Sequence, residues 1–352
     1  MERASSPISA TRNIPALKIY LLSDYSGNVD EGMKKIASYY KEGLVRRHHQ
    51  VSTKDVRAVL RPTSWRELRK AKPDIIHYVP GPSPISFLLT RFARMASPGA
   101  KAIMSATHPN FHGVFSLFTP LIRLLKSDLL LVQSTGTEQM LRRLGCKTAF
   151  LPSGVDMSRF SPVSDATRRQ LREKYGLNQS KFVVLHTGHL NRTRNIEVLS
   201  RLQQGDRQVI VVASTTTRAS ADIRHRLEKS GCLVLTGYQP EVEELYQLAD
   251  CYVFPTTDER GSVQMPLSVL EAMSCNLPVV TTRFGALPRF IEPEDGVIYI
   301  EHEDDMEKEL NKIQTGSLEV RTRDKVVPYS WENIVARLEE IYLTLVQLPT
   351  EQ

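Results

Sequence analysis

The stretch 251–290, CYVFPTTDERGSVQMPLSVLEAMSCNLPVVTTRFGALPRF, decides the fold of the chain. Its run 252–254 is rich in β-forming residues and stops at a proline, and a short helix at 268–273 follows Pro266, where the missing N–H costs nothing. The run 279–282 is β-branched without polar alternation, which is typical of a parallel strand buried on both faces. The stretch therefore predicts a βαβ unit, with a ligand beyond the carboxyl ends of its strands.

One carboxylate, Glu271, falls in this short helix. A helix start favours negative charge, so Glu271 could serve only to stabilise the helix dipole. A carboxylate beyond a strand end could equally accept hydrogen bonds from the hydroxyl groups of a ligand. The spacing alone leaves both interpretations open.

The segment 266–288, PLSVLEAMSCNLPVVTTRFGALP, resembles the donor-binding signature of family 4 glycosyltransferases, which have the GT-B fold. The resemblance implies that Glu271 holds the ribose hydroxyls of a nucleotide-sugar donor, and that Leu267 and Ser268 beside it belong to the donor site. The family usually carries a second glutamate eight positions upstream, near the donor sugar. This chain has Val263 there, and Gln264 is the nearest polar candidate, so the identity of the donor sugar stays open.

Two further segments resemble elements of the same family. The segment 151–162, LPSGVDMSRFSP, is similar to the element that ends the first domain, and 187–195, TGHLNRTRN, is similar to the phosphate loop. In that loop Gly188 matches the family glycine, while His189 stands in the place of an arginine and Arg194 in the place of a lysine. Arg194 keeps the positive charge and adds bidentate reach to phosphate oxygens. The loop could otherwise be an ordinary basic turn.

Arg192 in the same loop could compensate for the weaker positive charge of His189. With these segments, the resemblance to the family covers roughly residues 17–345.

Two candidates lie in the first half of the chain. His108 follows a predicted strand at 101–106, and Pro109 keeps it extended, so it sits where α/β active sites lie. The resemblance implies that His108 contacts the donor sugar near the reacting carbon, with His112 as a second candidate; the alternative is a histidine that only caps or packs. Gly27 follows a predicted strand at 17–22 and could bring backbone N–H groups close to a phosphate, or form only a tight turn.

The charge of the chain is unevenly distributed. The formal net charge is +7, but residues 1–175 hold 28 Lys and Arg against 13 Asp and Glu. A basic first half suggests an anionic partner, for which nucleic acid, an anionic membrane surface and a phosphorylated acceptor all qualify. The helix that follows Gly27 carries basic residues on its outer face, which is either a solvated face or a membrane-binding one; these residues are Lys34, Lys35, Lys41, Arg46 and Arg47.

Other features bound the class of protein. The four cysteines are scattered singly and predict reduced, buried thiols of a cytosolic protein. Residues 1–16 lack an apolar core and predict a disordered lead-in rather than a signal peptide. The apolar stretch 111–125 is interrupted by charged and proline residues and is too short to span a bilayer. It is explained by core packing, or by an apolar acceptor site beside the cleft.

The sequence thus predicts an α/β protein with the GT-B architecture, in which two Rossmann-like domains face each other across a cleft. The domains are expected at 17–162, on the acceptor side, and at 175–325, which binds the nucleotide sugar. A C-terminal helix at 330–350 is expected to pack back on the first domain. The order and spacing of the motifs agree with this arrangement.

The predicted function is a retaining glycosyltransferase that uses a nucleotide-diphosphate sugar, with no metal and no other cofactor. His108, Arg194 and Glu271 are the expected catalytic residues. We expect a lipid-linked or anionic acceptor, or an envelope or polysaccharide precursor, and a cytoplasmic protein that visits the inner face of the membrane. The alternative is a weakly active or non-catalytic relative that binds a nucleotide sugar. A nucleotide-sugar epimerase and a nucleic-acid-binding module fit the motifs less well. The sequence leaves the donor base, the acceptor and the oligomeric state open.

Overall fold

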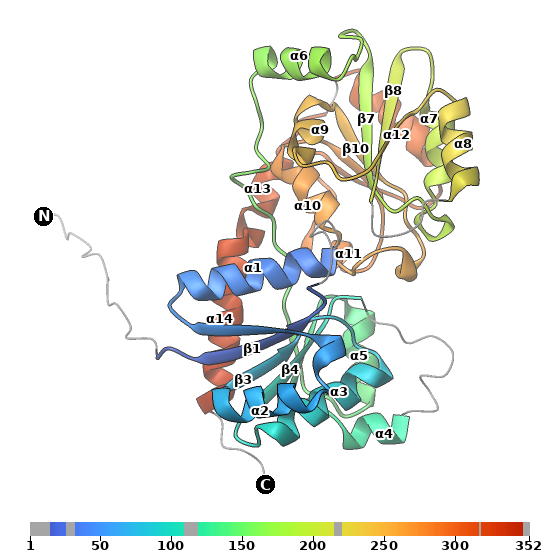
Figure 1. Cartoon of the computed structure of the whole chain (residues 1–352). Helices are drawn as coiled ribbons and strands as arrows, with labels where there is room; N and C mark the ends of the chain where they lie inside the picture. Colours follow the sequence, from blue (N-terminus) through green and yellow to red (C-terminus); the bar gives the residue numbers. More distant parts are fainter. Residues whose placement is uncertain (1–14, 26–31, 109–118, 215–219, 317, 348–352) are drawn as a thin grey trace, which may run out of the picture.

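A computed structural model describes residues 15–25, 32–108, 119–214, 220–316 and 318–347. The chain forms two six-stranded sheets, each flanked by helices (Figure 1). The strand order is β2-β1-β3-β4-β5-β6 in the first sheet and β12-β11-β10-β7-β8-β9 in the second. All neighbouring strands are parallel. The strands are β1 (Lys18–Ser23), β2 (Gln50–Asp55), β3 (Ile75–Tyr78), β4 (Lys101–Ala106), β5 (Leu129–Val132), β6 (Thr148–Phe150), β7 (Phe182–Gly188), β8 (Arg207–Ala213), β9 (Leu233–Thr236), β10 (Cys251–Phe254), β11 (Val279–Thr282) and β12 (Val297–Ile300).

The helices connect these strands and cover both sheets. Short 3-10 turns named η3 (Arg192–Arg194) and η5 (Glu259–Gly261) lie in the loops that follow β7 and β10. The α-helices are α1 (Gly32–Arg46), α2 (Pro62–Ala71), α3 (Pro84–Ala96), α4 (Thr119–Leu124), α5 (Thr135–Arg143), α6 (Asp165–Lys174), α7 (Leu199–Leu202), α8 (Ala221–Lys229), α9 (Val242–Leu248), α10 (Leu267–Ser274), α11 (Leu287–Phe290), α12 (Asp305–Gln314), α13 (Thr322–Val326) and α14 (Trp331–Gln347).

The βαβ unit predicted from the deciding stretch is confirmed as β10, α10 and β11. β10 and β11 pair in parallel, and the buried run Val279–Thr281 explains why the β-branched sequence has no polar alternation. The predicted strands at 17–22 and 101–106 are also confirmed, as β1 and β4. The sequence analysis missed β2, whose residues QVSTKD are polar because β2 is an edge strand with partly exposed side chains. The predicted lead-in at 1–16 lies almost entirely outside the described residues.

The last helix, α14, packs against α1 of the first domain (Figure 1). Trp331 at its start stacks on Tyr39 of α1 with ring centroids 4.5 Å apart. Further along, Glu339 accepts hydrogen bonds from Arg47 and forms a 2.7 Å contact with His49. Ser330 caps the start of this helix, since its Oγ accepts a hydrogen bond from the N–H of Asn333.

The carboxyl ends of the two sheets meet through the loop that precedes α10. The backbone N–H of Gln264 in this loop donates to the carbonyl of Thr107, which follows β4, at 2.7 Å. The next N–H, of Met265, donates to the side chain of Gln133, which follows β5, at 3.1 Å. The strand ends that carry ligand sites in open α/β sheets are therefore brought together at one place.

Two expectations from composition can be compared with the fold. All four cysteines are buried and free, as predicted. Within the part of the chain that the structure describes, we find no helix with the length and apolar character needed to cross a membrane.

Candidate functional site

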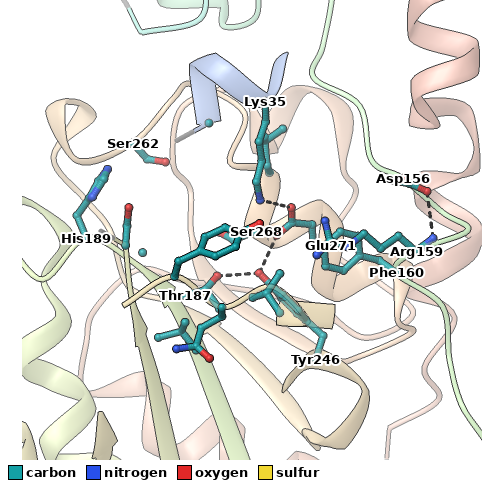
Figure 2. A pocket seen from close by; sticks show the side chains of 18 of the residues that line it. Lys35, Asp156, Arg159, Phe160, Thr187, His189, Tyr246, Ser262, Ser268 and Glu271 are labelled. Carbon is teal, nitrogen blue, oxygen red and sulfur yellow. Dashed lines mark hydrogen bonds and ion pairs between the residues drawn. The ribbon is translucent and has the colours of Figure 1, made fainter. Parts of the chain in front are cut away.

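A cavity of about 500 Å³ lies between the two domains (Figure 2). Its wall on the first domain is α1, and its walls on the second domain are the loop after β7 and the helices α9 and α10. The connecting segment between the domains adds Asp156, Arg159 and Phe160. The cavity therefore lies beyond the carboxyl ends of the second sheet's strands, where the sequence places the ligand.

Glu271 reaches this cavity from the second turn of α10, and both of its carboxylate oxygens have partners. Lys35 of α1 donates to Oε1 at 3.1 Å, and the hydroxyl of Tyr246 of α9 donates to Oε2 at 2.9 Å (Figure 2). Glu271 is only 7 % exposed. A buried carboxylate needs such partners, and these two fix its orientation from opposite domains.

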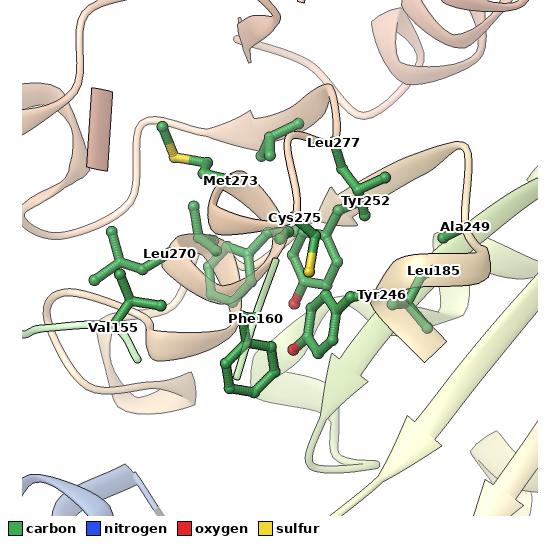
Figure 3. Packing of buried hydrophobic residues seen from close by; sticks show 14 of the residues in the cluster. Val155, Phe160, Leu185, Tyr246, Ala249, Tyr252, Leu270, Met273, Cys275 and Leu277 are labelled. Carbon is green, nitrogen blue, oxygen red and sulfur yellow. The ribbon is translucent and has the colours of Figure 1, made fainter. Parts of the chain in front are cut away.

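A network of hydroxyl groups from the second domain holds Glu271 in position. Tyr246 also forms a 2.7 Å hydrogen bond with Thr187 at the end of β7, and the hydroxyl of Tyr252 lies 3.4 Å from the same Oγ1. The rings of Tyr246 and Tyr252 stack, and Phe160 packs edge-on against Tyr246 (Figure 3). Burial, followed by the charge of Glu271, raises the pKa of Tyr246 well above its usual value, so its hydroxyl remains a donor.

Arg194 is a buried cation that lines the cavity without an acidic partner. It is 7 % exposed, and its guanidinium forms no ion pair with an acidic residue of the described chain. Its Nε is buried and has no hydrogen-bond partner among the described residues, and its guanidinium lies 5.7 Å from the centroid of the Phe254 ring. Burial lowers the pKa of Arg194 to about 10, which still leaves it protonated at neutral pH. A buried positive charge of this kind fits an anionic ligand.

Gly188 allows the backbone to run close to this guanidinium. A Cβ atom at Gly188 would lie 2.7 Å from Nη1 of Arg194 and 3.3 Å from Nε2 of His186. His186 is fully buried and its Nδ1–H donates to the carbonyl of Val253, which leaves Nε2 as an unpaired acceptor. Only glycine leaves the space that Arg194 occupies.

The structure brings together part of the predicted site. Gly188, His189, Leu267 and Ser268 all line the same cavity as Arg194 and Glu271. Arg192 is exposed and lies outside the cavity lining.

Other predicted residues lie apart from the cavity or outside the described chain. His108 follows β4, where its N–H donates to the carbonyl of Gly81, and it does not line the cavity. Gln264 is 1 % exposed, and its Oε1 has no partner among the described residues. Gly27 and His112 lie outside the described residues.

Val263 replaces the family's upstream glutamate with an apolar contact between the domains. It is buried, and a Cβ atom at Gly32, the first residue of α1, would lie 3.5 Å from one of its methyl groups. The position faces the start of α1 in the first domain. A carboxylate is therefore absent from this point of the described chain, and a valine packs there instead.

Sequence reasoning assigned Lys35 to the outer face of its helix, and this assignment is wrong. The Lys35 side chain is 24 % exposed and pairs with Glu271 across the cleft. A signal was present in the sequence, because polar side chains recur at helical spacing on one side of α1 and line the cavity together; they are Lys35, Ser38, Tyr39 and Glu42. Tyr246 was also missed, because its role depends on the packing of α9 against α10.

The arrangement combines one buried carboxylate and one buried cation in a single cavity. Glu271 can accept hydrogen bonds from vicinal hydroxyl groups, and Arg194 can bind phosphate oxygens. Among the residues that the structure describes, no cluster of His, Cys, Asp and Glu side chains is suited to a metal ion.

Two parallel sheets that meet at their carboxyl ends around this cavity define a GT-B protein. Residues 181–315 match the family model described as "Glycosyl transferases group 1". The second domain thus carries the sequence of this group, and the resemblance to family 4 GT-B glycosyltransferases seen in the sequence is confirmed.

Similar proteins with established names agree with this family. The D-inositol 3-phosphate glycosyltransferase of Corynebacterium jeikeium is 29 % identical over 159 residues, which cover 41 % of this chain and 37 % of that protein. The GDP-mannose-dependent monoacylated alpha-(1-6)-phosphatidylinositol monomannoside mannosyltransferase of Corynebacterium glutamicum is 25 % identical over 212 residues, or 54 % of this chain and 55 % of that protein. The matched regions thus span about a third to a half of these relatives.

Solved structures share the fold over nearly the whole chain. Sucrose-phosphate synthase of Thermosynechococcus elongatus has a TM-score of 0.73 at 18 % identity, covering 93 % of this chain and 98 % of that one. Anabaena Alr3699/HepE, solved in complex with UDP and glucose, has a TM-score of 0.67 at 15 % identity, covering 94 % of this chain and 100 % of that one. At this level of identity the likeness shows the fold alone.

Proposed function

We propose that this protein is a retaining glycosyltransferase that takes its sugar from a nucleotide-diphosphate sugar bound in the cavity between the domains. The observation that carries the proposal is the buried, acid-free Arg194 in the same cavity as Glu271. The carboxylate suits the ribose hydroxyls, and the guanidinium suits the diphosphate. The two ends of one nucleotide diphosphate account for both residues.

The reaction requires little of the protein beyond position and charge. The bond from the anomeric carbon to the diphosphate oxygen breaks, and its electron pair stays on that oxygen. The acceptor hydroxyl oxygen bonds to the anomeric carbon on the same face, and its proton passes to the departing diphosphate oxygen. Arg194, with His189 beside it, stabilises the negative charge that grows on the diphosphate. His108 does not line the cavity, so its proposed role in orienting the sugar requires the sugar to extend beyond the cavity lining toward the end of β4. No metal is needed in this scheme.

The comparisons support a nucleotide sugar without deciding its base. A structural neighbour was solved with UDP and glucose, whereas one relative is named as GDP-mannose-dependent. The acceptor is proposed to be lipid-linked or anionic. Its support is the excess of basic residues in the first half of the chain and the phosphatidylinositol mannoside in that relative's name. The protein would then act at the cytoplasmic face of a membrane.

The second candidate is a relative that binds a nucleotide sugar without transferring it. The observation in its favour is Val263, which packs where the family carries a glutamate near the donor sugar. This candidate shares the nucleotide site with the first. The two differ only in whether a bound donor is consumed.

A thermal-shift panel of nucleotide diphosphates and their sugars tests the donor site. One nucleotide should raise the unfolding midpoint of the wild type, because a ligand that binds only the native state stabilises it by mass action. Glu271→Ala and Arg194→Ala should each weaken the apparent affinity by at least about tenfold. Arg224→Ala is a matched control, since it removes an exposed arginine of α8 far from the cavity.

The outcomes separate the candidates. A nucleotide that stabilises the wild type and Arg224→Ala but neither site variant supports the donor site. Hydrolysis or transfer of that sugar then favours the enzyme, and tight binding with no turnover favours the second candidate. If no nucleotide shifts the wild type, the donor site is refuted.

A further inference from the structure

The outer face of α3 exposes a stripe of apolar side chains. Ile85 is 67 % exposed, Met95 is 52 % exposed and Leu88 is 38 % exposed. Together with the half-buried Phe92 they recur at positions i, i+3, i+7 and i+10, which places them on one side of the helix. The inner side of α3 is buried against the first sheet, so this stripe is a second apolar face that the described core does not use.

The neighbouring helix α2 adds a dense group of positive charges. The exposed basic residues of α2 and of its two capping positions have no ion pair among the described residues, and the one exposed acid of α2, Glu67, is already bound by Lys54 at 2.6 Å. These basic residues are Arg66, Arg69 and Lys70 in the helix, with Arg61 and Lys72 at the caps. Arg91 of α3 is exposed as well. The local charge is therefore strongly positive beside the apolar stripe.

The two helices form one continuous surface. α2 and α3 are in contact, and the rings of Trp65 and Phe92 lie 6.2 Å apart between them. Both helices lie on the side of the first sheet away from the second domain, at the lower end of Figure 1. We name as the α2–α3 surface the residues Arg61, Arg66, Arg69, Lys70, Ile85, Leu88, Arg91 and Met95.

We propose that the α2–α3 surface docks this protein on a bilayer that contains anionic phospholipids. Ile85, Leu88 and Met95 would enter the boundary between headgroups and acyl chains, as the apolar face of an interfacial helix does. The arginines and the lysine would lie among the lipid phosphates. A half-buried tryptophan–phenylalanine pair suits this interface, where amphipathic aromatic side chains concentrate.

The surface leads toward the proposed active site. α3 begins just beyond the carboxyl end of β3, and the loop between them is tied to His108 by the hydrogen bond to Gly81. Ile85, in the first turn, therefore lies at the cleft edge of the domain, and α3 runs away from it for about 20 Å. The inference rests on the proposed function, because this placement presents a lipid-linked acceptor to the cleft.

The basic helix that the sequence singled out for membrane binding, α1, is a weaker candidate. α14 packs along it, Arg47 is bound to Glu339, and Lys35 is bound to Glu271. Val45 is its one large apolar residue that is more than a third exposed. This contrast makes Val45 a useful control.

Sedimentation of the full chain with vesicles tests the proposal. The probes are vesicles of phosphatidylcholine alone and of phosphatidylcholine mixed with phosphatidylglycerol, at low and high salt. The wild type should bind only the mixed vesicles, and salt should weaken the binding. Ile85→Glu/Leu88→Glu should weaken it at least about tenfold. Arg66→Gln/Arg69→Gln/Lys70→Gln should weaken it by about fivefold for each charge removed.

Val45→Glu and Val327→Glu are the matched controls, since each puts a carboxylate at an apolar position about half exposed elsewhere on the molecule. Both should bind vesicles as the wild type does. The proposal is overturned if the wild type binds no vesicle, if only Val45→Glu loses binding, or if Ile85→Glu/Leu88→Glu alters the oligomeric state and leaves vesicle binding unchanged. Nucleotide thermal shifts of the same variants should equal that of the wild type. A chain that binds vesicles but no nucleotide would refute the proposed function and leave the docking surface standing.

Discussion

At the scale of the residue, the site holds two opposite charges, the carboxylate of Glu271 and the guanidinium of Arg194, in one poorly solvated cavity. Glu271 accepts one hydrogen bond from each domain, whereas Arg194 donates none to any acidic residue of the described chain. The carboxylate is thus held in position before a ligand arrives, whereas the cation keeps its bonding capacity for one. Such preorganisation favours binding of a ligand with hydroxyls at one end and negative charge at the other.

Removing the hydroxyl that holds Glu271 should disturb donor binding without disturbing the packing. Tyr246→Phe keeps the rings stacked on Tyr252 but leaves Oε2 of Glu271 and the hydroxyl of Thr187 without this partner. The free energy of unfolding should fall by about 1–2 kcal/mol. Donor affinity should weaken about tenfold, measured by isothermal titration with the nucleotide found in the thermal-shift panel.

A second tyrosine supplies the control for this prediction. Tyr175 also donates to a glutamate, Glu244, at 2.9 Å, but it does so outside the cavity. Tyr175→Phe should leave donor affinity unchanged. Equal affinities for Tyr246→Phe and the wild type would show that the Tyr246 hydroxyl has no part in positioning Glu271.

The sequence could predict the site residues that stand in short motifs, and it missed those whose contacts join distant parts of the chain. Glu271 and Arg194 stand in short motifs beside a strand end, and the resemblance of these motifs to the family implies that both bind the donor. Lys35 lies 236 positions from Glu271, and their contact exists only because the two domains face each other. Tyr246 reaches the same carboxylate through helix packing. Contacts of this kind cannot be read from periodicity.

At the scale of the element, the packing of α14 on α1 depends on one small residue. Gly43 is in the last turn of α1, and a Cβ atom there would lie 2.6 Å from a methyl carbon of Val335 in α14. Real Cβ atoms do not approach so closely. Because the valine side chain is restricted at χ1, one of the two helices would have to shift. Glycine is disfavoured inside helices, yet this contact requires it.

This contact yields a prediction about stability. Gly43→Ala should lower the free energy of unfolding by about 1–3 kcal/mol through overpacking, measured by urea denaturation. Gly43→Ala/Val335→Ala should recover part of that loss, because the second change removes the methyl groups that clash. Gly136→Ala in α5 is the control: no atom lies within 4 Å of its added carbon, so the same exchange should be neutral or stabilise by up to about 1 kcal/mol. A Gly43→Ala protein as stable as the wild type would contradict this view of the helix pair.

The same element shows how far sequence reasoning reaches. The final helix was predicted at 330–350 and is found as α14 at Trp331–Gln347, with Ser330 as its cap. The edge strand β2 has too few apolar residues to be recognised, because half of its surroundings are solvent. Apolar patterns identify elements that are buried, and they fail for elements that are half covered.

At the scale of the whole molecule, the uneven charge distribution has a structural counterpart. The basic first domain and the acidic second part of the chain meet at the cavity, where Lys35 of the first faces Glu271 of the second. In the connecting segment, Arg159 binds Glu243 of α9 in the same way. Opposite charges thus pair where the two domains meet. The basic residues of the α2–α3 surface, on the far side of the first domain, form no such pairs within the described chain and are available to bind an anionic partner.

Each sheet also contains one fully buried histidine, and this should make the whole molecule sensitive to mild acid. His77 lies in β3 of the first sheet and His186 in β7 of the second, and burial lowers the pKa of each from 6.5 to about 3. Between these values the unfolded chain binds a proton at each histidine and the folded chain does not. Stability therefore falls as the pH falls below 6.5, by up to about 1.4 kcal/mol per pH unit for each histidine.

Urea denaturation at about pH 7.5 and about pH 5.5, where most carboxylates stay ionised, measures this effect. His77→Gln and His186→Gln each remove one such histidine, so each should reduce the loss of stability between the two pH values, whatever its effect on stability at the higher pH. His302→Gln changes an exposed histidine and should leave the loss as it is in the wild type. If all three variants lose as much stability as the wild type, the two buried histidines do not cause the loss. These histidines would then be able to bind protons in the folded protein.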